Sequence, residues 1–328
     1  MFHIFFSADE NYIKFVAPLI FSIIKSTKSN QKFINFAHSQ NNDCTEGYVF
    51  HILSAKAINS DSIQRLELLC AKLSNIYPCN VVNHAVNDKL FAENNVPIWK
   101  GNYQAYLRFF IDNFLDPEVS SCLYLDVDMI VLDDIRRLRT VDITNATLMV
   151  AHLPDVFNQN FFNSGFIFFN IKKWRENNYQ SKCIDYTIKH RSLDQDTLNA
   201  VIKKDNLLIL PKEWNYCLQT FQSDDEAILS KSTVALIQSG IKIIHYIRPK
   251  PWLPITNWIV KSKGKCFRYQ NVIDIWWHNA IDTPFFSDEL LKLKSDLNTI
   301  NSKFITAHFN YLTLLSIKVN EFLYKYMH

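Results

Sequence analysis

The stretch Leu123-Tyr-Leu-Asp-Val-Asp-Met-Ile-Val-Leu132 determines the expected fold. Apolar residues lead up to Asp126 and resume directly after Asp128, a pattern typical of a buried central strand. Buried carboxylates are unfavourable by several kcal/mol unless something neutralises them, and a divalent cation at the carboxyl end of the strand is the simplest partner. Because open α/β sheets bind ligands at that edge, the stretch predicts a metal-dependent site for a phosphorylated ligand.

The Asp-x-Asp spacing alone is weak support for such a site, because it also arises by chance in chains of this size. A second copy, Asp194-Gln-Asp196, stands where a helix is expected to begin. One of its carboxylates is therefore explained equally well as the N-cap of that helix. What favours a metal site at Asp126 and Asp128 is the apolar sequence on both sides of them.

The composition limits the class of protein and the kind of phosphate site. Hydrophobic residues make up 48% of the 328 residues and charged residues 20%, which suits one principal α/β domain with an appendage. The five glycines form neither a Walker A loop nor GxGxxG. Any phosphate must then be held by a metal, by side chains or by helix N-termini. The net charge of +3 does not favour a nucleic-acid partner.

The cysteines and the first residues predict a cytoplasmic protein. The seven cysteines include no CxxC pair and suit reduced thiols. The opening Met1-Phe-His-Ile-Phe-Phe6 has no basic segment and is soon followed by Asp9-Glu10, so no signal peptide is expected. The apolar run over 16–24 is too short to span a bilayer.

Strand and helix patterns alternate along the chain, as in a doubly wound sheet. We expect strands over 3–6, 33–38, 51–53, 80–86, 123–132, 147–152, 161–171, 207–211 and 241–246. We expect helices over 12–26, 61–73 and 99–114, and further helices beginning near 172 and 193.

The pattern changes from Leu290 onwards. Apolar residues then recur at a mean step of about 3.6, which predicts one or two amphipathic helices and not a heptad coiled coil. Three interpretations stay open for this region: a helical layer packed on the core, a contact with a membrane surface, or a contact between subunits.

Several separated stretches, taken together, resemble the family 8 retaining glycosyltransferases, and among them the bacterial enzymes that extend the core of lipopolysaccharide or lipooligosaccharide. The resemblance covers about residues 3 to 286, and its specificity lies in six motifs in the right order. They are Ser7-Ala-Asp-Glu-Asn-Tyr12; Tyr106-Leu-Arg108; Leu123-Tyr-Leu-Asp-Val-Asp128; Phe162-Asn-Ser-Gly165 with Asn170-Ile-Lys-Lys-Trp174; Leu193-Asp-Gln-Asp-Thr-Leu-Asn199; and His245-Tyr246 with Lys250-Pro-Trp252. A further similarity, to the carboxy-terminal part of the lipopolysaccharide core enzymes, lies in Trp276-Trp277 and Asp282-Thr-Pro-Phe285.

The resemblance implies a fold and an activity. The expected fold is GT-A, an α/β fold with a mixed, mainly parallel sheet, with a catalytic domain over 1–255 and a mostly helical region over 256–328. The expected reaction moves a hexose, galactose or glucose, from a UDP-sugar to a glycan or glycolipid acceptor with retention of configuration. The expected location is cytoplasmic, with the helical region as a candidate for peripheral inner-membrane contact or homo-oligomer formation.

The resemblance also implies the metal ligands. Asp126 and Asp128 match the metal-binding DxD of the family, and His245 matches its third protein ligand. Taken alone, a histidine at a strand end is more often structural. A nitrogen ligand favours Mn²⁺ over Mg²⁺, and both remain candidates.

The remaining site residues match positions that hold the donor. The nucleoside-binding turn is matched by Ala8, Asp9, Asn11 and Tyr12, the donor-sugar wall by Arg108, Asn163, Ser164, Asp194 and Gln195, and the leaving diphosphate by Asp126 (through the metal) and Lys250. No residue is assigned as a nucleophile. Gln195 matches the position closest to the reacting carbon, and Asp194 is expected to hold donor-sugar hydroxyl groups.

One loop departs from the family pattern. Ile247-Arg248-Pro249 replaces the expected glycine turn, and only five residues separate His245 from Lys250 where the family typically has six. This places the backbone contact to the diphosphate and the reach of Lys250 in question, and Arg248 is a candidate for the missing charge.

Two other classes of function remain as alternatives. A phosphatase would use Asp126 as its nucleophile and Asp128 as its acid. A sugar-binding relative without activity would keep only the fold. The intact DxD, His245 and Lys250 argue against this second alternative.

Overall fold

The computed structural model describes residues 1–32, 45–99, 101–153, 161–218, 236, 238–255 and 270–308. The strand expected over 33–38 and the tail beyond 308 lie outside these residues. Each strand and helix below is named by its bounds within the described part of the chain.

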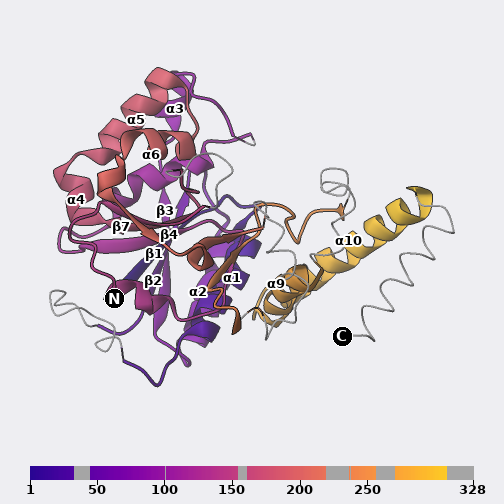
Figure 1. The fold of residues 1–328 in the computed structure, drawn as a ribbon. Coiled ribbons are helices and arrows are strands. Elements are labelled where there is room, and N and C mark those ends of the chain that lie inside the picture. The colour runs from indigo at the N-terminus through magenta and orange to yellow at the C-terminus, as the bar shows by residue number, and fades with distance from the viewer. Residues whose placement is uncertain are drawn as a thin grey trace.

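A seven-stranded sheet forms the centre of the molecule (Figure 1). In spatial order its strands are β3 (Cys79–Ala85), β2 (Tyr48–Ser54), β1 (Phe2–Ser7), β4 (Ser121–Leu125), β7 (Phe166–Asn170), β6 (Leu148–Ala151) and β8 (Leu207–Leu210). Neighbouring strands run parallel except β7, which is antiparallel to both β4 and β6. Most central strands are buried on both faces, which explains their continuous apolar sequences. The mixed, mainly parallel sheet confirms the expected fold class.

Helices cover both faces of this sheet (Figure 1). Alternate residues of β1 separate the two hydrophobic clusters: Ile4 and Phe6 join one, and Phe5 joins the other. On the Ile4 side lie α1 (Ile13–Ser26), α2 (Ser60–Leu73) and α9 (Gln270–Asp282). On the Phe5 side lie α3 (Lys89–Glu93), the 3₁₀ helix η2 (Gln104–Phe114), α4 (Ile171–Glu176), α5 (Tyr179–His190) and α6 (Asp194–Val201).

The prediction of one continuous strand over 123–132 is wrong. The ladder of β4 ends at Leu125, and the chain resumes as β5 (Met129–Val131) in a separate three-stranded sheet. In that sheet β5 pairs with β10 (Ile243–His245), which pairs with β9 (Tyr216–Cys217). The physical reason is long-range pairing: Met129 to Val131 form their backbone hydrogen bonds with β10 and not with the strands of the large sheet.

The prediction of a helix over 99–114 is wrong at its start. Trp99 and Asn102 form a tight turn with two mutual backbone hydrogen bonds of 3.1 and 3.2 Å. Gly101 has a φ of +85° in this turn, which ends any helical path there. The helix begins only at Gln104, as the 3₁₀ helix η2.

Three histidines, His3, His51 and His84, form a hydrogen-bonded row across β1, β2 and β3. His51 lies in the middle, 2.9 Å from the ring of His3 and 2.8 Å from that of His84, nitrogen to nitrogen. Burial lowers the pKa of His51 to about 3, with both neighbouring histidines adding to the shift. His51 is therefore held in its neutral form near pH 7.

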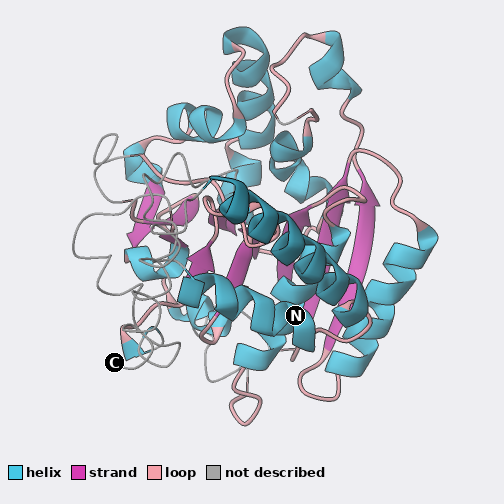
Figure 2. Cartoon of the chain, turned by 90° about the vertical axis from the view of Figure 1, so that its right-hand side faces the viewer, coloured by secondary structure: helices cyan, strands magenta, loops and turns pink. Residues whose placement is uncertain are grey.

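The helix α10 (Ser287–His308) confirms the helical prediction for the described part of the C-terminal region. It extends away from the sheet in Figure 1 and crosses in front of it in Figure 2. Its Leu290 and Leu297 are buried in the same cluster as Ile4 and α1. The first half of α10 thus covers the core. No helix in the described ranges combines the length and apolar character needed to cross a bilayer.

Short 3₁₀ helices complete the described chain. They are η3 (Ile135–Thr140), η4 (Lys204–Asn206) and η5 (Lys212–Asn215).

Candidate active site

Two strands of the small sheet bring the predicted metal ligands together. Asp126 and Asp128 lie between β4 and β5, and His245 ends β10, opposite Met129 in the β5 register. The His245 Nε2 atom lies 3.2 Å from Asp128 Oδ1 and 3.8 Å from Asp126 Oδ2. One ligand atom from each of the three residues lies within 4.8 Å of the others. The three side chains therefore converge as the sequence predicted.

The surroundings of these ligands fit a divalent cation. Asn215 Oδ1 is 3.0 Å from His245 Nδ1, which directs the other ring nitrogen towards the carboxylates. Beside them, Gly165 leaves a space: a Cβ built there would lie 2.5 Å from His245 Cε1 and 2.7 Å from Asp126 Oδ2. Two carboxylates and one imidazole form a donor set suited to Mn²⁺, and also to Mg²⁺ with weaker preference.

Positive groups collect around Asp128. Lys250 Nζ donates a hydrogen bond to Asp128 Oδ2. Burial alone would raise the pKa of Asp128, but Lys250 and His245 outweigh it and hold this pKa well below its usual range. Burial alone would lower the pKa of His245, but the Asp128 carboxylate outweighs it and raises the pKa to about 10. The buried carboxylate thus attracts cationic partners strongly.

Arg108 fixes a second group of side chains. Its guanidinium is buried and donates to Asp126 Oδ1 at 3.0 Å, to the carbonyl of Ala105 at 2.8 Å and to the carbonyl of Ser164. Its Nε atom lies 3.3 Å from Asp194 Oδ2. Arg108 therefore links the acidic segment after β4 to the first turn of α6.

Asp194 is not an N-cap. The residue before α6 is Leu193, and the helix has no side-chain cap. Instead Asp194 Oδ2 accepts a hydrogen bond of 2.9 Å from Ser164 Oγ. Burial raises the pKa of Asp194, and the charge of Arg108 offsets part of that rise. The carboxylate is thus directed towards the site and away from the helix end.

Gln195 is tied to the loop before β7. Its Oε1 atom accepts hydrogen bonds from Asn163 Nδ2 at 3.0 Å and from the Ser164 backbone N–H at 3.2 Å. Asn163 Oδ1 also accepts from Asn215 Nδ2 at 3.0 Å. The network connects the predicted sugar-wall residues to the residue that orients His245.

A pocket of about 820 Å³ opens over these groups. Its lining combines polar and apolar residues. The polar lining consists of Arg108, Asp126, Asp128, Asn163, Ser164, Asp194, Gln195, Asp196, His245, Arg248 and Lys250. The apolar lining consists of Trp99, Ala105, Leu153, Phe161, Leu193, Ile247, Pro249 and Leu253.

The predicted nucleoside-binding residues form a turn after β1, outside the lining of this pocket. The Asn11 backbone N–H donates to Asp9 Oδ1 at 3.0 Å, and Ala8 is buried. Burial raises the pKa of the Tyr12 hydroxyl; the charge of Lys250 opposes the rise, and acidic neighbours add to it. Tyr12 is therefore the residue of the turn that lies near the site.

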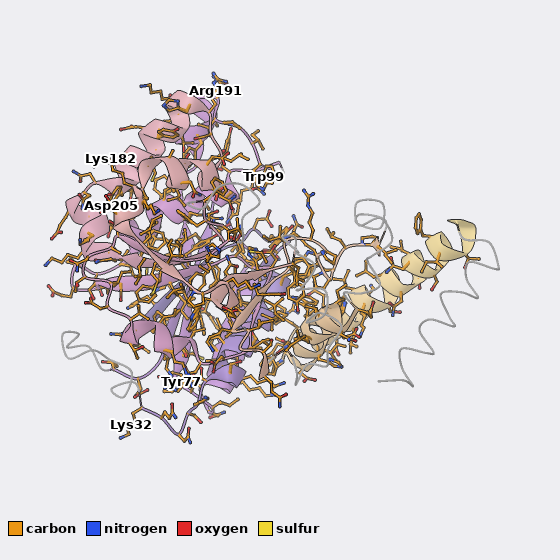
Figure 3. The ribbon with its side chains drawn as sticks, viewed as in Figure 1. Lys32, Tyr77, Trp99, Lys182, Arg191 and Asp205 are labelled. Atoms are coloured by element: carbon orange, nitrogen blue, oxygen red, sulfur yellow. The ribbon has the colours of Figure 1, made fainter. Side chains whose placement is uncertain are left out.

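Sequence reasoning missed several residues of the site. Asn215 orients His245, and Tyr124 donates to Asp126 Oδ1 at 3.0 Å. Asn215 stands in no recognisable pattern, and Tyr124 lies inside the acidic motif, where the sequence indicates only an apolar strand residue. Trp99 falls within the predicted helix, yet it lies in the turn before η2, is exposed at the surface (Figure 3) and lines the pocket.

Two known glycosyltransferases are similar to this chain over most of its length. A lipopolysaccharide 1,2-glucosyltransferase of Escherichia coli is 24% identical over 295 residues, which cover 84% of this chain and 79% of that protein. A lipopolysaccharide 1,3-galactosyltransferase of Salmonella typhimurium is 24% identical over 295 residues, which cover 80% of this chain and 79% of that protein.

Solved structures show the same fold. The galactosyltransferase LgtC, in complex with donor and acceptor sugar analogues, matches with a TM-score of 0.63 at 18% identity and covers 89% of this chain and 99% of its own. This likeness confirms the GT-A fold. The model of the family described as glycosyl transferase family 8 matches residues 3–256. The chain therefore belongs to glycosyl transferase family 8 and is a glycosyltransferase.

Proposed function

We propose that the protein is a metal-dependent, configuration-retaining hexosyltransferase that uses a UDP-sugar donor and a lipopolysaccharide, lipooligosaccharide or other surface-glycan acceptor. The observation that carries the proposal is the convergence of Asp126, Asp128 and His245 in the lining of the pocket. The sugar and acceptor classes come from the two lipopolysaccharide enzymes to which the chain is similar.

The proposed cofactor is Mn²⁺, with Mg²⁺ as the alternative, held by the two aspartates and the histidine. When bound, such an ion neutralises charge on the donor diphosphate. Lys250 lines the same pocket, is paired with Asp128 and is proposed to contact the leaving diphosphate. Stabilising the developing charge of that group is the main route to rate acceleration, because its departure is the chemical difficulty.

The remaining residues are proposed to hold the donor. Tyr12 would stack on uracil, while Ala8, Asp9 and Asn11 form the turn that reads the base edge and ribose. The sugar would lie against the wall of Arg108, Asn163, Ser164, Asp194 and Gln195. The bonds that fix Asp194 and Gln195 keep both side chains in place before any substrate arrives, which reduces the entropy lost on binding.

Gln195 and Asp194 are the proposed catalytic residues of the sugar wall. Asp194 would hold donor-sugar hydroxyl groups, and Gln195 would lie closest to the reacting carbon. The acceptor would then approach the pocket over Trp99 and Leu253, which line it and are exposed at 45% and 39%. Exposed apolar side chains beside a polar site are typical of a surface that receives a second ligand.

The remaining proposals concern the whole chain. We divide it into a catalytic domain over 1–255 and a C-terminal region over 256–328. We place the reaction in the cytoplasm, where nucleotide sugars are made. The C-terminal region would contact the inner membrane or a second subunit. Binding to anionic vesicles that weakens with added salt would indicate the membrane contact, and a doubled mass in solution would indicate the subunit contact.

A panel of UDP-sugars tested for hydrolysis without acceptor, with and without Mn²⁺, tests the proposal. The expected result is metal-dependent release of UDP from UDP-galactose or UDP-glucose. Release of phosphate from a phosphomonoester, with no UDP release, would indicate the phosphatase alternative. Binding of a UDP-sugar without any turnover, even with candidate acceptors, would indicate a sugar-binding relative.

A further inference from the structure

The charges that line the pocket are mostly neutralised by one another. Each nitrogen of the Arg108 guanidinium donates to a protein oxygen, and the group lies between the carboxylates of Asp126 and Asp194. Lys250 is paired with Asp128. The cations to which the family resemblance assigns donor contacts are therefore already bound to aspartates.

Arg248 differs from both of them. It is exposed, it lines the same pocket, and it forms no hydrogen bond or ion pair with any residue in the described part of the chain. Its guanidinium is therefore available to a ligand. No other lysine or arginine of the lining combines these properties.

The backbone holds Arg248 close to the metal ligands. The Tyr246 backbone N–H donates to the Asp128 carbonyl at 2.8 Å, and the Ile247 N–H donates to the His245 carbonyl at 3.0 Å. The buried Pro249 follows and restricts the backbone. The Arg248 side chain can change its rotamer, but its backbone is held in place two residues before Lys250.

We propose that Arg248 binds the diphosphate of the nucleotide donor and of the nucleoside diphosphate product, in the loop where the family pattern has a glycine. This rests on the proposed function. A guanidinium presents two parallel N–H groups that match two phosphate oxygens. UDP carries more negative charge than the diphosphate of a UDP-sugar, because its terminal phosphate is no longer esterified. Arg248 therefore binds the product state more tightly than the donor.

Binding of UDP and of uridine, both with Mn²⁺, measured by calorimetry, tests this assignment. Arg248→Gln should weaken UDP binding about tenfold, the loss expected for one charge-assisted hydrogen-bonded contact, and leave uridine binding unchanged. Arg248→Lys should restore part of the affinity, since it keeps the charge but not the paired N–H groups. The matched control is Arg137→Gln, because Arg137 is exposed and does not line the pocket.

Three results would overturn the assignment. UDP affinity in Arg248→Gln equal to that of the wild type excludes a diphosphate contact. An equal loss for UDP and uridine means that Arg248 does not act on the diphosphate. A raised acceptor KM with unchanged UDP binding means that Arg248 contacts the acceptor instead. Failure of the proposed function looks different, because the wild-type protein would then bind neither UDP nor a UDP-sugar, or would bind a UDP-sugar without any turnover.

Discussion

Replacing Gly165 by alanine should disable the site through one added methyl group. The new Cβ would lie 2.5 Å from His245 Cε1 and 2.7 Å from Asp126 Oδ2, where ordinary contacts begin near 3.4 Å. The atoms must therefore separate by about 0.9 and 0.7 Å. Neither neighbour moves easily: the histidine is held by Asn215, and the carboxylate by Arg108.

The expected magnitude follows from that displacement. Overpacking of a buried site typically destabilises a protein by about 1–3 kcal/mol. Metal–ligand distances vary by only about 0.2 Å, and a misplacement of about 1 Å reduces rates about a hundredfold. We expect Gly165→Ala to lower kcat/KM for a UDP-sugar by about two orders of magnitude and to weaken Mn²⁺ binding.

The assay combines UDP release, Mn²⁺ titration and thermal unfolding, with Gly240→Ala as the control. Gly240 has a φ of +88°, and a Cβ added to it would meet no atom within 4 Å, so alanine there strains the backbone by about 1–2 kcal/mol without touching the site. It should lose stability and keep its kinetics. A folded Gly165→Ala enzyme with wild-type kcat/KM and Mn²⁺ affinity would refute the reasoning.

Three other predictions follow from the described contacts. Asp128→Asn should lower Mn²⁺ affinity and activity at least a hundredfold, because it removes a charged ligand; near-normal turnover at saturating Mn²⁺ would exclude the metal role. The folded-state pKa of His51 is about 3, below its ordinary 6.5, so the unfolded chain takes up the proton first as the pH falls. The stability that His51 contributes is thus complete above about pH 6.5 and decreases by up to about 1.4 kcal/mol per pH unit towards pH 3. The free energy of unfolding of His51→Gln, measured with urea, should fall less steeply with decreasing pH than that of the wild type. An identical pH dependence would contradict this. Leu290→Ala should destabilise the protein by about 2–5 kcal/mol, because Leu290 is fully buried, whereas Leu291→Ala, at a position 44% exposed, should change little; equal melting temperatures would show that α10 does not cover the core.

Apolar runs were sufficient to predict most strands and helices. The sequence over 2–7, 48–54 and 166–170 is apolar because these strands are buried, and periodicity identified α1, α2 and α10 for the same reason. The break at 126–128 was not predictable, since apolar residues continue on both sides. The change of sheet depends on pairing with β10, more than a hundred residues later.

The site was predictable where side-chain chemistry stands in a motif. Asp126 and Asp128 stood out as carboxylates in an apolar run, and His245 was found only through the family resemblance. Asn215 could not be found, because its role depends on which strands pair. Trp99 was wrongly assigned to a helix because the apolar residues near it suit one. The turn at Gly101, which has a positive φ, keeps the helix from beginning there.

The small sheet has a consequence for biosynthesis. Asp128 and Lys250 are 122 residues apart in the sequence, and the strand that carries His245 is among the last to leave the ribosome. While β10 is still in the ribosome, Asp128 lacks both Lys250 and His245, whereas Asp126 can already pair with Arg108. The cation site is therefore completed late, after the large sheet can form, and ligand binding stabilises the assembled chain and not its N-terminal part.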